Sequence, residues 1–67
     1  MGFTQKTLDK LPENIRSHIE NLKCCYNHPD LIKDDVKLAS ISYCLALYHV
    51  GLVTEIEKRL LYTYITL

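Results

Sequence analysis

Glycine and proline are scarce in this sequence of 67 residues, which has two of each, and tryptophan is absent. The few glycines and prolines separate apolar segments, as residues that end or connect helices do. No segment keeps the alternation of apolar and polar residues that a half-buried strand requires, and no internal repeat is present. The sequence therefore predicts a single small all-α domain over residues 1–67.

Net charge and long hydrophobic runs are also missing, because eight basic residues balance eight acidic ones. A protein that binds the phosphates of nucleic acid needs a basic face, so the balance argues against a nucleic-acid partner. No run approaches the roughly 20 apolar residues of a membrane span. Cysteines number three, an odd count, and residues 1–11 lack the apolar segment of a signal peptide. We expect a reduced cytoplasmic protein without disulfides.

Three main helices are predicted after a short N-terminal helical turn. The first covers about residues 12–26, because Pro12 suits a first helical turn and Ile15, Ile19, Leu22 and Tyr26 follow at helical spacing. The second covers about residues 31–50.

The ends of the second and third helices have their own sequence signals. Asp30 is a candidate cap for the second helix, and Gly51 is suited to the left-handed position that ends it. The third helix covers about residues 55–66. Thr54 and Glu57 have the spacing of a capping box at its start.

The second predicted helix is apolar around most of its circumference, with two seams at helical spacing. One seam consists of Val36, Ala39, Tyr43, Leu47 and Val50. The other consists of Leu38, Ile41, Leu45, Tyr48 and Leu52. A helix with two apolar seams must be covered on two sides, so we expect residues 39–50 to form a central helix that is buried twice, by the other helices or by a second chain.

No arrangement of residues typical of a catalytic site is evident, and we predict neither an enzyme nor a cofactor. Cys24, Cys25 and His28 form the one metal-like group, but zinc needs four ligands and adjacent cysteines diverge on a helix. Cys44 and His49 lie on one predicted helix, yet a spacing of five residues does not place them on one face. We interpret Cys44 as a core residue.

Five tyrosines are present, and tyrosine is enriched at protein interfaces because its ring is apolar and its hydroxyl polar. We therefore predict a non-enzymatic interaction protein, a small regulator or inhibitor that binds another protein, itself as a homodimer, or both. Small proteins of this kind occur in phages and mobile elements. The predicted contact residues are Tyr48, Leu61, Tyr62 and Ile65.

Two alternatives remain open. Residues 46–66 have the order of a helix-turn-helix, which would make the protein a DNA-binding regulator. Gly51 is one position later than the motif requires, and Glu55 and Glu57 would repel phosphates. The second alternative is a thiol or metal sensor at Cys24, Cys25 and His28.

Overall fold

The computed structural model describes the backbone of residues 2–67 and the side chains of residues 4–67, and this part of the chain contains helices and no strand. The helices are α1 (Gly2–Asp9), α2 (Glu13–Tyr26), α3 (Lys33–His49) and α4 (Glu55–Ile65). The predicted all-α class is confirmed, and the three main helices begin and end within two residues of their predicted bounds. The predicted short N-terminal helical turn is confirmed as α1, a helix of eight residues.

The helix ends agree with the sequence signals in two cases and differ in one. The Thr54 hydroxyl accepts from the Glu57 backbone N–H, and the Glu57 carboxylate accepts from the Thr54 N–H, so the capping box is confirmed. Gly51 has a φ of 84°, in the left-handed region. Asp30 does not cap α3, because the N-cap position is Ile32 and no side chain caps it there.

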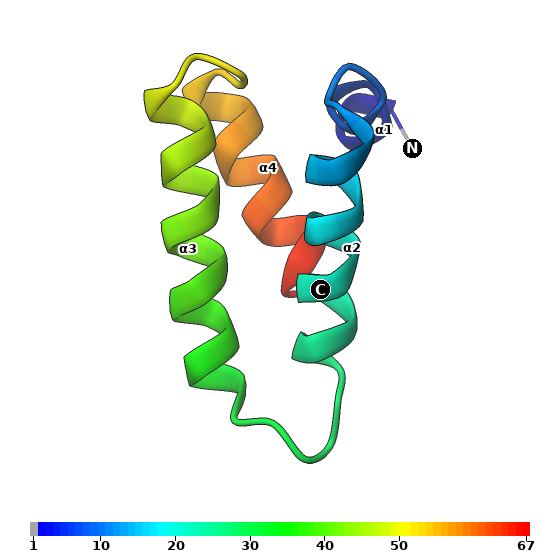
Figure 1. Cartoon of the computed structure of the whole chain (residues 1–67), viewed down its shortest axis with the longest axis vertical. Helices are drawn as coiled ribbons and strands as arrows, with labels where there is room; N and C mark the ends of the chain where they lie inside the picture. Colours follow the sequence, from blue (N-terminus) through cyan, green and yellow to red (C-terminus); the bar gives the residue numbers. More distant parts are fainter. Residues whose placement is uncertain (1) are drawn as a thin grey trace.

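Helix α4 is the central element, since it packs against each of the other three helices. Figure 1 shows α2 and α3 side by side, α4 inclined between them, and α1 near the end where α4 begins. Leu61 and Ile65, on the inner face of α4, have no exposed surface. The prediction that residues 39–50 form the central helix is wrong, because α3 is covered by α2 and α4 and its outer side stays open.

The side of α3 that faces the core agrees with the first predicted seam at Val36 and Leu47 and departs from it at Ser40 and Cys44. Its buried residues are Val36, Ser40, Cys44 and Leu47. Serine can occupy this face because the Ser40 hydroxyl donates a 2.7 Å hydrogen bond to the Val36 carbonyl, one turn earlier. A buried hydroxyl with a partner avoids the desolvation cost that makes unpaired polar groups rare in cores.

Two polar contacts fix the C-terminal half of α4 against α2. The Tyr64 hydroxyl donates a 2.6 Å hydrogen bond to the Glu20 carboxylate, which raises the pKa of Tyr64 to about 12. The Lys23 ammonium donates to the Tyr64 carbonyl at 2.8 Å and lies 4.4 Å from the centre of its ring. Helix α4 has no basic residue in its own last turn, so Lys23 supplies the positive charge that favours a helix C-terminus.

Glu57 connects the start of α4 to the N-terminal segment. Its carboxylate accepts a 2.7 Å hydrogen bond from the Lys10 ammonium, besides the bond from the Thr54 N–H. The Thr7 hydroxyl, which is buried, donates to the other carboxylate oxygen at 3.4 Å. The bond from Lys10 first, and then the bond from the Thr54 N–H, lower the pKa of Glu57 below its ordinary value.

The substitution Glu57→Gln should lower the free energy of unfolding at pH 7 by about 1 kcal/mol, because an amide loses the charge that Lys10 contacts. Since the folded-state pKa is lowered, the difference from wild type is fully present above the ordinary pKa of a glutamate. It disappears as the pH falls through the lowered value. Urea unfolding between pH 2.5 and pH 7 measures this difference.

Glu55→Gln is the matched control, because the Glu55 pair with Arg59 is exposed on both sides and should contribute less than about 0.5 kcal/mol. A Glu57→Gln curve parallel to wild type down to pH 2.5 would contradict the assigned role of the Glu57 charge.

Candidate functional site

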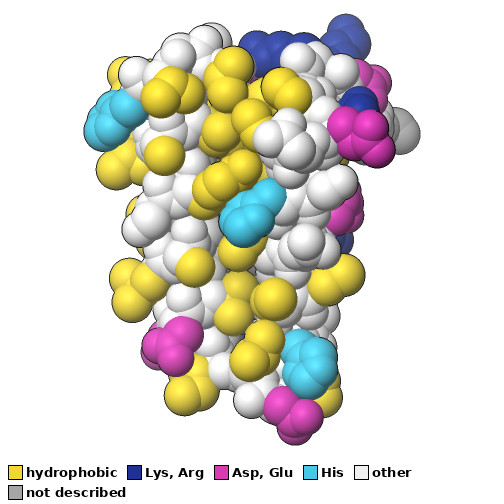
Figure 2. Space-filling model, viewed as in Figure 1, with side chains coloured by type: hydrophobic (Ala, Val, Ile, Leu, Met, Phe, Trp, Pro, Cys, Tyr) yellow, Lys and Arg dark blue, Asp and Glu magenta, His cyan; other side chains and the backbone are white. Residues whose placement is uncertain are grey.

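The most unusual surface of the protein is a row of exposed apolar side chains along α3 and the turn after it. We call it the outer stripe, and it consists of Leu38, Ile41, Leu45, Tyr48 and Leu52. Their exposed fractions lie between 37% and 65%, and Figure 2 shows hydrophobic side chains at the surface at several heights along α3. Contiguous apolar surface of this kind marks interaction sites more often than isolated exposed leucines do.

The outer stripe borders a groove of about 340 Å³ between α3 and α4. We call it the α3–α4 groove; the residues that line it are Ile41, Cys44, Leu45, Lys58, Arg59, Tyr62 and Thr63. Ile41 and Leu45 belong to both surfaces, so the stripe and the groove form one continuous face. Grooves of this form between paired helices accept an amphipathic helix.

The cationic side chains at the rim of the groove both have partners. The Lys58 ammonium lies 5.2 Å from the centre of the Tyr48 ring, within the range of a cation–π contact. The Arg59 guanidinium contacts the Glu55 carboxylate at 3.1 Å. The partner of the Lys58 ammonium is an aromatic ring and not a carboxylate. An acidic ligand could therefore contact this ammonium without displacing a carboxylate.

The predicted contact residues divide into two pairs. Tyr48 belongs to the outer stripe, and Tyr62 lies half-buried in the groove, packed against the core. Leu61 and Ile65, in contrast, are wholly buried in the chain's own core. Their predicted contact role is not retained, because a partner could reach them only if α4 left its place.

Ile41 and Leu45 take the place of Leu61 and Ile65 in the contact surface, and the prediction of contact residues did not include them. The helical spacing that could have identified them is that of the predicted seam Leu38, Ile41, Leu45, Tyr48 and Leu52, to which both belong. What the spacing alone did not show was which of the two seams of α3 the other helices would leave open.

The only sulfur in the groove belongs to Cys44, whose side chain is almost completely buried. Burial raises the pKa of the thiol to about 11, although the nearby Lys58 ammonium opposes this shift. At pH 7 only about one thiol in 10,000 is therefore ionised. Because the thiolate is the nucleophile, Cys44 acts as a packing residue, in agreement with the sequence-based interpretation.

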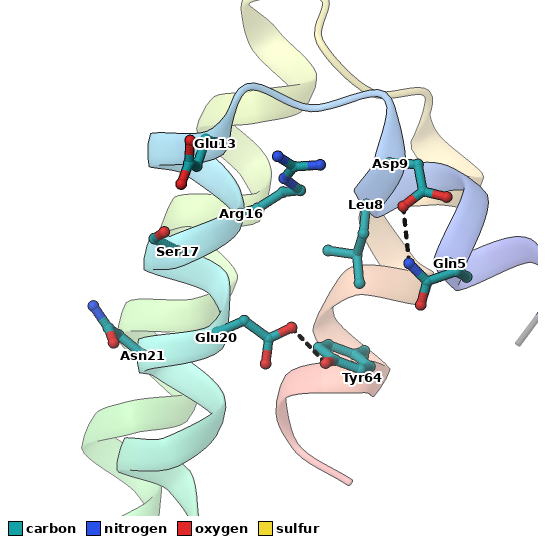
Figure 3. A pocket seen from close by; sticks show the side chains of 9 residues that line it. All are labelled: Gln5, Leu8, Asp9, Glu13, Arg16, Ser17, Glu20, Asn21 and Tyr64. Carbon is teal, nitrogen blue, oxygen red and sulfur yellow. Dashed lines mark hydrogen bonds between the residues drawn. The ribbon is translucent and has the colours of Figure 1, made fainter.

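A second hollow, of about 490 Å³, lies between α1, α2 and the end of α4. Figure 3 shows that polar side chains line most of it, with Arg16 extending from α2 towards α1, and Glu20 bonded to Tyr64. Gln5 and Asp9 on α1 are hydrogen-bonded to each other. Glu20 is engaged by the contact that fixes α4, so the hollow has the character of a polar surface with a structural role.

The residues of the proposed sensor site do not form a ligand cluster. Cys24 is exposed, Cys25 is half-buried, and the Nδ1 atom of His28 accepts a hydrogen bond from the Asp30 backbone N–H. Within the described residues, no group of three or more His, Cys, Asp or Glu side chains is placed to hold a metal ion.

No described helix is long and apolar enough to cross a membrane.

The corner predicted as an alternative DNA-binding motif is a helical hairpin, in which α4 returns along α3 (Figure 1). The first turn of α4 contains Glu55 and Glu57, so it would present negative charge to a phosphate backbone.

No protein-family model matches the sequence, and neither a curated protein nor a solved structure matches it.

Chemical labelling of the folded protein should distinguish the Cys24 thiol from the Cys44 thiol. Cys24 should react with iodoacetamide at the rate of a free exposed thiol, because it is exposed. Cys44 should react at least 100-fold more slowly at pH 7.5, and at the same rate as Cys24 once the chain is unfolded in urea. Mass spectrometry of the labelled peptides measures both rates; equal labelling in the native state would mean that the base of the groove is open.

Proposed function

We propose that this protein is a non-enzymatic interaction module that binds an amphipathic helix of a protein partner in the α3–α4 groove and along the outer stripe. By occupying that helix it acts sterically, as a small regulator or inhibitor of its partner. The observation that supports this most is the continuous apolar face formed by Ile41, Leu45 and their neighbours on α3 and α4.

The chemistry of the groove favours binding over catalysis. Its thiol is protonated at neutral pH, and its cations contact an aromatic ring and a carboxylate rather than a potential nucleophile. A catalytic site needs a nucleophile or base activated by a neighbour. An apolar floor with a basic rim is suited instead to a helix whose apolar stripe is flanked by acidic residues.

Two features of the chain explain why a helix would bind here with useful affinity. Tyr62 presents a large ring at the groove, and aromatic side chains in partly buried positions contribute strongly to binding energy. The groove walls belong to two helices joined by the short turn at Gly51 and by core packing through Cys44 and Leu61. A preformed groove avoids the entropy cost of ordering on binding.

Selection from a random library of displayed 16-residue peptides tests the proposal. Selected peptides should have apolar residues at positions i, i+3, i+4 and i+7, with acidic residues beside them, and should become helical when bound. Fluorescence anisotropy with labelled peptides should show that Leu45→Asp raises the dissociation constant on the order of 100-fold, because a carboxylate would be buried against apolar groups.

Ile56→Asp is the matched control, since Ile56 is an exposed apolar residue of α4 that does not line the groove. It should leave the affinity within about twofold of wild type. The proposal fails if the selected peptides lack helical periodicity, or if Leu45→Asp binds them as tightly as Ile56→Asp does.

A further inference from the structure

Two exposed leucines of the outer stripe, Leu38 and Leu45, lie seven residues apart on α3, and Leu52 follows after seven more residues in the turn beyond the helix. Ile41 and Tyr48 follow Leu38 and Leu45 by three residues, so the seam on the helix covers two heptads. Leucine every seven residues with an apolar residue three positions later is the pattern of a coiled-coil seam, which a partner helix with the same period covers. Globular core faces have a wider, less regular stripe.

From this repeat we infer that a second copy of the chain binds the outer stripe, so that the protein forms an antiparallel homodimer through α3. The inference rests on the proposed function, because it names the helix that fills the proposed site. Helix α3 itself meets the description of the expected ligand, with an apolar stripe and two acidic residues, Asp34 and Asp35, in its first turn.

The antiparallel direction follows from the charges at the two ends of α3. Asp34 and Asp35 lie at the start, and Lys58 lies over the Tyr48 ring near the end. In a parallel pair the aspartates of the two copies would face each other and repel. In an antiparallel pair Asp34 of each copy, which lies on the seam one turn before Leu38, is directed towards the end of α3 where Lys58 of the other copy lies, and the helix dipoles also oppose each other favourably.

The seam residues define the register of this dimer. When Leu38 of one copy lies level with Tyr48 of the other, Ile41 lies level with Leu45, and the two-fold axis passes near residue 43. Such a two-fold contact uses the same residues twice, as isologous dimers do. The seam residues of α3 from Leu38 to Tyr48 are then covered on both copies.

Helix α4 takes part because Ile41 and Leu45 line the groove as well as the seam. The antiparallel two-fold axis places the α4 helices of both copies on the same flank of the α3 pair. The result is a four-helix arrangement built from two helical hairpins. The groove becomes its interior, with Tyr62 of each copy near the axis.

The first test is the mass of the reduced protein by light scattering and sedimentation equilibrium from 1 to 500 µM. The expected result is a dimer at tens of micromolar. Leu45→Asp should be monomeric over the same range with an unchanged circular dichroism spectrum, and Ile56→Asp should dimerise like wild type. A wild-type protein that is monomeric at 500 µM, or a Leu45→Asp variant that still dimerises, would overturn the inference.

Disulfide trapping tests the direction of the helices. In a Cys24→Ser/Cys25→Ser background, Ser42→Cys should give a covalent dimer on mild oxidation, because residue 42 is one position from the axis. His49→Cys should not, because the two copies of residue 49 lie about 18 Å apart along the helices at 1.5 Å per residue. Crosslinking at position 49 and not at position 42 would contradict the antiparallel arrangement.

The two proposals fail differently in these experiments. A monomeric protein that binds selected helical peptides through Leu45 keeps the proposed function and loses the homodimer. A dimer that Leu45→Asp disrupts, but that selected peptides neither bind nor dissociate, keeps the homodimer and contradicts the binding of a foreign helix.

Discussion

The placement of α4 between the other helices is the constraint on which the structure depends. Leu61 and Ile65 have no exposed surface, and the packing partners of α4 come from every other helix. A chain of 67 residues buries only roughly 60% of its unfolded surface, so its stability depends on a few fully buried side chains. The capping box at Thr54 and the contacts of Lys23 with Tyr64 fix the two ends of this helix, and the other helices are positioned by it.

That placement has a direct consequence for α3. Helix α3 presents Cys44 and Leu47 to the core, while Leu38 and Ile41 remain outside it. Ser40 and Cys44 are small, so the core-facing side of α3 holds little apolar volume and the larger residues lie on the outer side. The large apolar side chains that α3 leaves exposed are therefore gathered on one face, next to α4. A further helix would fit on that face.

The sequence was sufficient for the helices and for most of their ends, because these depend on local signals; the exception is the start of α3, where Ile32 and not Asp30 is the N-cap residue. Thr54 and Glu57 formed the expected cap, and Gly51 took the expected left-handed conformation. The errors concern which face of a helix meets which neighbour, a property of residues far apart in the chain. Ser40 was not expected in the core, because its partner, the Val36 carbonyl, is a backbone group that no composition argument includes.

The same limit explains the outcome for the contact surface. Leu61 and Ile65 were predicted at an interface, but the apolar character of a side chain indicates burial without showing what buries it. The structure shows that the chain's own core buries them. Tyr48 and Tyr62 lie where a partner could reach them, Tyr48 in the outer stripe and Tyr62 in the α3–α4 groove.

The length of α3 bears on how an exposed heptad seam can function. The helix has 17 residues, and an isolated pair of helices this short would be marginal, because so few seam layers offset the cost of ordering both. Here α3 is already ordered by its packing against α2 and α4. The conformational entropy of α3 is therefore lost on folding and not on binding, so a helix that binds the outer stripe has only its own entropy to lose. The core formed around Leu61 thus makes the outer stripe usable, and this links the burial of α4 to the binding proposed for α3.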